Sequence, residues 1–434
     1  MIKKILKKIG KNSIISQKEI ASAAHEKRNA VLKLSSEIIS KNTNKIIEAN
    51  KEDLLLANKA GLKESYIDRL LLDSKRISAI SESLISISTL PDPLSGKITK
   101  WERPNGLIIS KQPTPLGVLG IIYESRPNVT VDAAALCIKS GNSVILRCGS
   151  DSYNSCYILS ELIRDALQQC NLSKDIIQLI PSKDREAVDY MLKMSNIIDV
   201  IIPRGGKSLV EKVQKNARVP VFSHLEGICH IYVDQFAELE KSCSVVINGK
   251  MRRTGICGAT ETLLVNEHIA KKFLPKICSE LNEKGCKIVG DEVTKSIVPY
   301  IDLAIEEDWS TEYLAPKISI KVVGDVYDAI EHIQKFGTQH TDAIMTENKE
   351  IAKVFTNAVD SAIVLVNAST QFADGGEFGL GAEIGISTGK LHARGPVGAA
   401  QLTSFKYVVH GNGCLLYTSP SPRDQRGSGM PYYA

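Results

Sequence analysis

The chain has 434 residues, of which 43% are hydrophobic and 24% charged, and it carries a net charge of +5. At roughly 150 residues per domain, this length predicts about three domains or two large ones, with an ordinary globular composition. The weak positive charge argues against a nucleic-acid partner, and no apolar run reaches the roughly 18 residues of a membrane-spanning helix.

The first ninety residues are predicted to be helical. Segment 1–11 is rich in lysine but lacks the continuous apolar region of a secretory signal, so we expect a solvated first helix. Residues 16–89 carry apolar side chains at three- and four-residue spacing, as in Val31, Leu34 and Ile38. Alternating stretches around Asn105-Gly106 then predict a β-hairpin over residues 97–112.

From residue 116 the pattern changes to alternating strands and helices. The expected strands are 116–122, 143–146, 176–180 and 197–202, separated by helices at 131–139, 153–170 and 185–194. Such alternation predicts a parallel sheet with helices on its faces. A second alternation over 261–366 predicts a second α/β unit, and residues 403–410 are expected to form one late strand.

The ten cysteines include no C-x-x-C pair, which disfavours zinc ribbons and redox motifs and favours a reducing cytosol with mostly structural thiols. Residues 414–434 contain three prolines and no periodic apolar face, so they are predicted to be disordered. This tail also resembles translated cloning or adapter sequence; the alternative is a natural flexible tail.

A glycine pair offers the first candidate binding site. The chain has no G-x-G-x-x-G after a strand and no complete Walker A motif. However, Gly205-Gly206 follows an apolar strand and precedes a helical pattern, and Arg204 and Lys207 flank the pair. Such a turn lets backbone approach an anion at a helix N-terminus, which predicts a phosphate cradle. An ordinary strand-to-helix turn is the alternative.

Cys257 is the candidate nucleophile. It lies in the segment KMRRTGICG, where Lys250, Arg252 and Arg253 would favour a thiolate and the glycines would leave room for a substrate. The alternative is a structural thiol. Residues 374–385 hold five glycines in twelve positions and predict a loop close to a ligand, or else a flexible linker.

Seven segments together resemble a known family. They occur in order along the chain and comprise 115–128, 143–147, 202–206, 227–234, the Cys257 loop, 340–343 and 367–396. The series resembles the gamma-glutamyl phosphate reductase family, also called glutamate-5-semialdehyde dehydrogenases, within the aldehyde dehydrogenase superfamily. The resemblance covers about residues 1–413. No kinase-like segment precedes it, so the resemblance is not to the fused synthase that carries both activities.

The resemblance implies an α/β fold of the aldehyde dehydrogenase type. We expect N-terminal helices and a Rossmann-like cofactor domain in 1–235, with a β-hairpin oligomerisation arm at about 97–112. A catalytic α/β domain with Cys257 would cover 236–395, and 396–413 would return to the arm as an oligomerisation strand. The resemblance also implies a cytoplasmic homo-oligomer acting on a small molecule, functionally associated with glutamate 5-kinase, with no membrane or nucleic-acid partner.

The resemblance further implies which residues bind the cofactor NADPH or NADP⁺. Arg147 matches a position near the adenosine ribose, Arg204-Gly205-Gly206 the turn near the pyrophosphate, and Glu312 a glutamate that holds the nicotinamide ribose. No metal is expected. Cys148 stands where the family has glycine, and its side chain would either crowd the nucleotide or pack. The candidate substrate-binding residues, taken from matching motifs, are Ser125, Arg126, Asn128, His340 and Arg394.

The implied reaction is the NADPH-dependent reduction of L-glutamyl 5-phosphate to L-glutamate 5-semialdehyde in proline biosynthesis. Cys257 would form a thioester and release phosphate, and hydride transfer would then yield the aldehyde. Ser125 falls near the superfamily's oxyanion asparagine. Glu226 falls near the base of hydrolytic relatives and is a candidate proton acceptor. Two alternatives remain: a hydrolytic aldehyde dehydrogenase that uses Glu226, and a non-catalytic scaffold on the same fold.

Overall fold

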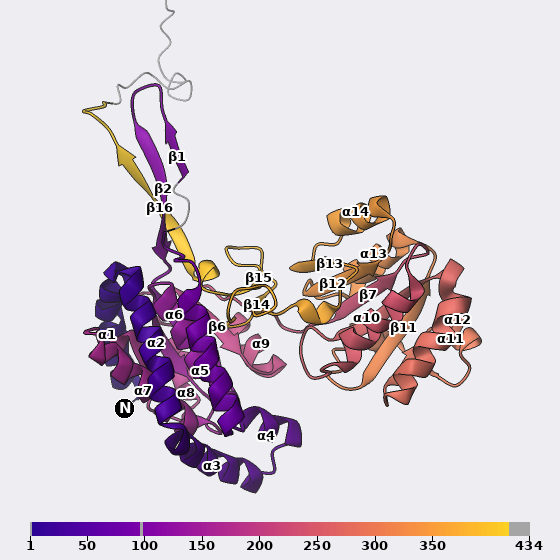
Figure 1. The fold of residues 1–434 in the computed structure, drawn as a ribbon, viewed down its shortest axis with the longest axis horizontal. Helices are drawn as coiled ribbons and strands as arrows, with labels where there is room; N and C mark the ends of the chain where they lie inside the picture. Colours follow the sequence, from indigo (N-terminus) through magenta and orange to yellow (C-terminus); the bar gives the residue numbers. More distant parts are fainter. Residues whose placement is uncertain (1, 96–98, 416–434) are drawn as a thin grey trace, which may run out of the picture.

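The computed structural model describes residues 2–95 and 99–415, and Figure 1 shows them as two lobes with an arm rising from the first. The first lobe contains a four-stranded parallel sheet in the order β5-β4-β3-β6. Its strands are β3 (Val118–Tyr123), β4 (Ser143–Arg147), β5 (Ile177–Leu179) and β6 (Val200–Arg204). β3 and β4 are buried along their whole length, as expected for a parallel sheet covered on both faces.

Helices surround this sheet, and all the predicted α/β elements are present with small shifts in their bounds. The helices are α1 (Ile2–Ser22), α2 (His25–Lys41), α3 (Thr43–Lys59), α4 (Glu64–Leu70), α5 (Ser74–Thr89), α6 (Asn128–Lys139), α7 (Tyr153–Gln169), α8 (Glu186–Met191) and α9 (Lys207–Asn216). The expectation of a solvated first helix is wrong for one face of α1. Leu6 and Ile9 are buried in the core with Met191, while lysines occupy the other face.

The second lobe contains a seven-stranded parallel sheet in the order β10-β9-β11-β8-β7-β12-β13. Alternate residues of β7 point to opposite faces, so Ile231 and Val233 pack on one core and Tyr232 on another. The strands are β7 (Cys229–Val233), β8 (Thr260–Asn266), β9 (Lys287–Gly290), β10 (Asp302–Leu303), β11 (Lys317–Val323), β12 (Thr341–Met345) and β13 (Ile363–Val366).

Helices cover both faces of this sheet as well (Figure 1). One core includes residues of α10 and α11, and the core on the opposite face includes residues of α13 and α14. The helices of this lobe are α10 (Leu239–Met251), α11 (Glu267–Glu283), α12 (Glu292–Ile297), α13 (Val326–Phe336) and α14 (Lys349–Ala358). The second predicted α/β unit is therefore confirmed.

The arm is an antiparallel sheet in the order β1-β2-β16. β1 (Thr99–Glu102) and β2 (Ile108–Pro115) form the predicted hairpin, and β16 (Thr403–His410) is the predicted late strand. Gly106 adopts φ +80° in the turn, a conformation that glycine adopts easily. Residues 97 and 98 of the predicted hairpin, and the tail beyond 415, lie outside the described residues.

The chain returns from the second lobe to the arm through the first lobe. Ile384, Val397 and Leu402 belong to the first lobe's core, and the short strands β14 (Ile386–Ser387) and β15 (Gly395–Pro396) lie on this path. β7 precedes residue 235 yet belongs to the second sheet, so the sheets divide earlier than the expected boundary. Within the described residues, no helix combines the length and hydropathy needed to span a bilayer.

Candidate active site

Cys257 lies in the loop between α10 and β8, and a buried ion pair joins the two ends of that loop. Lys250, the penultimate residue of α10, donates to Glu261 in β8, and each side chain is at most 1% exposed. Burial raises the pKa of Glu261 to about 7 despite the opposing charge of Lys250. Glu261 also accepts a hydrogen bond of 3.3 Å from the backbone of Leu314, which ties the loop to the segment containing Glu312.

The turn before β7 packs directly against the backbone of Cys257. A Cβ built on Gly227 would lie 2.0 Å from the carbonyl oxygen of Cys257, so only glycine fits this position. The backbone N–H of Gly227 donates to Oε1 of Glu312 at 2.9 Å. Cys229 donates its thiol proton to the Cys257 carbonyl oxygen at 3.1 Å. Glu312 therefore bonds to the turn that packs against Cys257.

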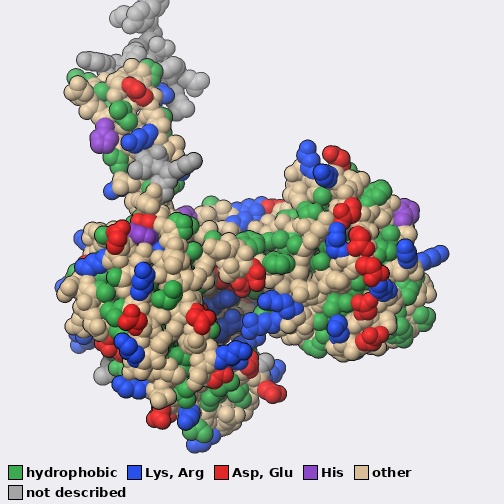
Figure 2. Space-filling view, in the orientation of Figure 1, with side chains coloured by type: hydrophobic (Ala, Val, Ile, Leu, Met, Phe, Trp, Pro, Cys, Tyr) green, Lys and Arg blue, Asp and Glu red, His purple; other side chains and the backbone are tan. Residues whose placement is uncertain are grey.

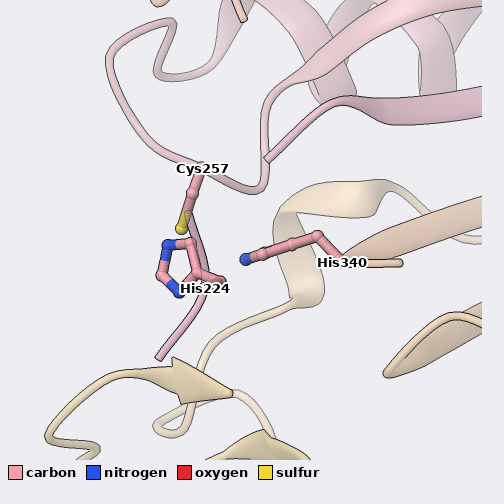
Figure 3. A group of neighbouring side chains, drawn as sticks. All are labelled: His224, Cys257 and His340. Carbon is pink, nitrogen blue, oxygen red and sulfur yellow. The ribbon is translucent and has the colours of Figure 1, made fainter. Parts of the chain in front are cut away.

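Two histidines converge on the Cys257 thiol (Figure 3). His224 comes from the loop before β7 and His340 from the residue before β12, and one donor atom of each lies within 4.8 Å of Sγ and of the other. The Nδ1 atom of His224 lies 2.7 Å from the carbonyl oxygen of Ile386. Because a carbonyl only accepts, Nδ1 carries a proton, and Nε2 of the neutral ring is free to accept one.

The histidines control the ionisation of Cys257. Burial raises the pKa of the Cys257 thiol, but the imidazoles of His340 and His224 outweigh it and hold the pKa well below its usual value. Burial lowers the pKa of His224, but the charge of Cys257 and the hydrogen bonds that the ring makes to Cys257 and to the Ile386 carbonyl together outweigh burial and raise this pKa above its usual value. The pair is therefore poised as a thiolate beside an imidazolium, which is the reactive form of a nucleophilic cysteine.

The sequence predicted a thiolate stabilised by cations of its own loop, whereas the leading groups that lower the Cys257 pKa are two histidines. Lys250 is neutralised by Glu261, and Arg252 donates to the side chain of Gln371 at 3.3 Å. His224, which the sequence analysis did not single out, supplies the stabilisation together with His340. No local pattern links a histidine before β7 to a loop before β8, because only the pairing of these neighbouring strands brings them together.

Arginines from the first lobe surround the thiol. Burial and the nearby charges of Arg204 and Arg69 lower the pKa of Arg126 to about 9, while the Cys257 charge raises it. Arg69 donates to the carbonyl oxygen of Gly255 in the cysteine loop at 3.4 Å. Figure 2 shows Lys and Arg side chains gathered in the hollow between the lobes. The cleft thus suits a substrate with negative charges beside its reacting carbon.

The turn at Gly205-Gly206 fits a nucleotide phosphate. Gly206 precedes the first residue of α9, and no heavy atom of the described residues lies within 4 Å of a Cβ built on it. Its N–H donates to Oε2 of Glu124 at 3.3 Å, so this helix end already attracts an anionic group. Arg204 ends β6 and lies 3.7 Å from Glu383, whose pKa burial raises to about 7.

Arg147 and Cys148 occupy structural positions at the end of β4. The guanidinium of Arg147 donates to the carbonyl oxygens of Lys183 and Asp184 at 3.2 and 3.3 Å, so it braces the neighbouring loop. Cys148 is 4% exposed and belongs to the core of the first lobe. Of the two outcomes expected for Cys148, the structure shows packing.

Four other candidate residues form hydrogen bonds with nearby side chains other than Cys257. Asn128 donates to Asp132 at 3.0 Å, and Arg394 donates to Asp360 at 2.7 Å. Ser125 is 4% exposed, has φ 49° and donates to Asp151. Glu226 accepts from Lys207 at 2.9 Å. Among the charged and imidazole side chains that interact with the thiol are His340, His224, Arg126, Glu312 and Glu383.

Two parallel α/β lobes, a thiol flanked by two imidazoles and a hairpin arm are the features of the aldehyde dehydrogenase class. The model of the Aldehyde dehydrogenase family matches residues 7–300, and the chain belongs to this family. The chain is 51% identical to the gamma-glutamyl phosphate reductase of Brucella suis biovar 1, over 95% of this chain and 98% of that protein. It is 52% identical to the gamma-glutamyl phosphate reductase of Parvibaculum lavamentivorans, over 94% of this chain and 97% of that one.

A solved structure shows the same relationship. The crystal structure of gamma-glutamyl phosphate reductase from Thermotoga maritima matches with a TM-score of 0.92 at 44% identity, covering 95% of this chain and all of that one. Within the aldehyde dehydrogenase family, the chain thus groups with the gamma-glutamyl phosphate reductases. The fold and family expected from the sequence are confirmed.

Proposed function

We propose that this enzyme reduces L-glutamyl 5-phosphate to L-glutamate 5-semialdehyde, with release of phosphate, as a step of proline biosynthesis. Similarity to gamma-glutamyl phosphate reductases along nearly the whole chain supports the reaction. The observation that carries the mechanism is the Cys257 thiol, held between two imidazoles beside a group of arginines. An acyl phosphate needs a strong nucleophile and a cation-lined site for its leaving group, and this cleft provides both.

The first step forms a thioester. The Cys257 thiolate attacks the acyl carbon, the new C–S bond forms, and the C–O bond to phosphate breaks as inorganic phosphate leaves. Arg69, Arg126 and Arg204 stabilise the negative charges of the phosphate and of the substrate carboxylate. His224 holds the proton taken from the thiol.

In the second step the thioester is reduced and its C–S bond breaks, which releases the aldehyde. A bound NADPH would supply a hydride to the thioester carbonyl; the C–S bond would then break, giving the aldehyde and the Cys257 thiolate. The imidazoles of His224 and His340 stabilise Cys257 as a departing thiolate, just as they stabilise it as a nucleophile. No water is activated in this direction, so Glu226 can remain bonded to Lys207.

The cofactor would bind along the carboxyl ends of the first sheet. Aldehyde dehydrogenases use nicotinamide cofactors, and we assign NADPH from the gamma-glutamyl phosphate reductase resemblance. Gly205 and Gly206 would face the pyrophosphate with Arg204 beside it, and Arg147 would lie near the adenosine ribose. Glu312 would hold the nicotinamide ribose, because it already bonds to the turn beneath Cys257.

The arm supports a proposal of homo-oligomers. β16 forms one edge of the arm sheet, and its Phe405, Tyr407 and Val409 are exposed large hydrophobic side chains. Burial of such side chains against a second copy would stabilise an assembly. We also propose a cytoplasmic location and a functional association with glutamate 5-kinase, which would make the labile acyl phosphate.

The proposed reaction is tested in reverse. The purified protein is supplied with glutamate 5-semialdehyde and NADP⁺, with and without inorganic phosphate, beside the Cys257→Ala variant. Turnover that requires phosphate and disappears in the variant supports the reductase. Phosphate-independent turnover would instead indicate a hydrolytic dehydrogenase and make Glu226 the next target. A folded wild-type protein without turnover would favour the scaffold alternative.

A further inference from the structure

The cluster that activates Cys257 also has the composition of a transition-metal site. One thiol sulfur and two imidazole nitrogens lie within 4.8 Å of one another, and they come from three separate segments of the chain (Figure 3). Tetrahedral zinc sites with three protein ligands use the same kinds of donor and leave a fourth position open. Small side-chain movements would bring three donors at this separation into one coordination sphere.

The outer contacts of both histidines leave a nitrogen facing the cluster. Nδ1 of His224 bonds to the Ile386 carbonyl, and Nδ1 of His340 lies 2.9 Å from the hydroxyl oxygen of Thr341. These contacts orient the rings as the outer hydrogen bonds of metal-ligating histidines do. His340 is fully buried, and its Nε2 makes no hydrogen bond of normal geometry within the described residues, although the ring interacts with the Cys257 thiol. A buried nitrogen without such a hydrogen bond is costly, and a metal ion would satisfy it.

The charges around the cluster are mixed. Arg126, Arg204 and Arg69 oppose a cation, whereas the carboxyl groups of Glu312 and Glu383 interact with the thiol charge and favour one. The chemical type of the three ligand atoms determines which metal ion this cluster prefers. Sulfur and imidazole ligands favour Zn²⁺ over Mg²⁺ or Ca²⁺, which take oxygen ligands. The thiol is half-buried, so an ion can reach it from the cleft.

We propose that Cys257, His224 and His340 bind one Zn²⁺ ion reversibly, with the fourth position open to water. The bound ion would hold the thiolate as a ligand, so it would block acylation and protect the sulfur from alkylation and oxidation. Metal binding itself does not depend on the reaction; only the inhibition rests on the proposed function.

Cobalt titration tests the site directly. The metal-free full-length protein is titrated with Co²⁺ under a non-thiol reductant. We expect one equivalent to give thiolate-to-cobalt charge transfer and tetrahedral d–d absorption, both removed by Zn²⁺. The near-isosteric Cys257→Ser should abolish the charge-transfer band, and His224→Gln and His340→Gln should each weaken binding by about tenfold or more. Cys414→Ser, which removes an exposed thiol, is the matched control and should retain the band.

Activity assays separate this proposal from the proposed function. Zn²⁺ should inhibit the phosphate-dependent reaction and EDTA should restore it. An active enzyme that shows no cobalt band, or a band that persists in Cys257→Ser, would overturn the metal site and leave the reductase intact. A normal cobalt titration in a protein without turnover would uphold the metal site and count against the reductase. Circular dichroism of each variant shows whether it is folded, so that loss of the cobalt band in a folded variant can be assigned to loss of a ligand.

Discussion

The two sides of the interlobe cleft are built in different ways. On the thiol side, the backbone of Cys257 leaves no room for a Cβ on Gly227, and His340 is fully buried. On the cofactor side, the turn at Gly206 is exposed, and space is open where a Cβ would be. The proposed nucleophile is therefore positioned by tight packing, whereas the proposed phosphate-binding turn offers backbone donors at a solvated edge.

This difference indicates how each side responds to change. A packed interior relaxes little, so a displaced group loses most of its interaction at once. At an exposed turn, a substitution weakens the hydrogen bonds from the backbone N–H groups only gradually, because water and neighbouring side chains can replace part of the lost interaction. We therefore expect abrupt losses of turnover on the thiol side and graded changes in cofactor KM on the cofactor side.

The largest effect is expected for Gly227→Ala. Its Cβ would lie 2.0 Å from the Cys257 carbonyl oxygen, so the cysteine loop or the turn must shift. A displacement of about 1 Å at a reacting group can lower the rate about 100-fold, and we expect kcat to fall at least that far. Steady-state kinetics in the phosphate-dependent direction measure this change.

Gly206→Ala is the matched control for this comparison. The added methyl group meets open space, so we expect an unchanged melting temperature and at most a several-fold rise in the KM for NADP⁺. Equal losses of kcat in the two alanine variants would contradict the contrast between the two sides.

The buried ion pair predicts the next largest effect. Lys250→Met leaves the Glu261 carboxyl buried without its partner, which should lower the free energy of unfolding by about 3–5 kcal/mol. Thermal unfolding followed by circular dichroism measures the loss. The double variant Lys250→Met/Glu261→Leu should recover part of it, and a double variant no better than the single one would argue against a specific pair.

The same pair predicts a dependence of stability on pH. Burial raises the pKa of Glu261 from 4.5 to about 7, so the folded protein binds this proton more tightly than the unfolded chain. The contribution of Glu261 to the free energy of unfolding is therefore fully present below pH 4.5 and is lost as the pH rises to about 7. In Glu261→Gln, the free energy of unfolding should no longer fall over this pH range. In Lys250→Met, the fall should extend to higher pH, because the carboxyl group lacks the charge that lowers its pKa.

The sequence predicted the local elements better than it predicted the surroundings of the candidate site residues. Apolar spacing was enough to indicate the first parallel sheet and the second α/β unit, and Asn105-Gly106 was enough to indicate the hairpin. Cys257 was found because its loop is distinctive, but its ionisation depends on His224 and on a strand pairing that periodicity does not encode. Arg69 was missed for the same reason, since α4 reaches the cysteine loop only in the folded chain.

Removal of one imidazole should produce an intermediate effect. His224→Gln eliminates one of the two groups that hold the Cys257 pKa below its usual value. A thiol with the free pKa of about 8.5 is only a few per cent ionised at pH 7, so alkylation by iodoacetamide at that pH should slow about tenfold. In the wild type the alkylation rate should already be level near neutral pH, whereas in the variant it should climb through the alkaline range. Superimposable profiles would assign the thiolate to His340 alone.

The smallest effect is expected on the cofactor side, at Glu124. Its carboxylate accepts a hydrogen bond of 3.3 Å from the N–H of Gly206, at the helix end where the cofactor's phosphate would bind. A negative charge near a helix N-terminus is worth about 0.3–1 kcal/mol, so the carboxylate competes modestly with a second anion. Glu124→Gln should therefore lower the KM for NADPH about two- to fivefold with little change in kcat.

Glu211→Gln removes the same charge from the exposed side of α9, away from its first turn, and provides the control for Glu124→Gln. We expect it to leave the KM unchanged, because the effect of a helix end on a charge falls off within one turn. A higher KM in Glu124→Gln would mean that Glu124 helps to hold the cofactor rather than competing with its phosphate. Cofactor binding at the exposed turn would then depend on a specific side chain. The two sides of the cleft would still differ in one respect, the close packing of Gly227 against the backbone of Cys257.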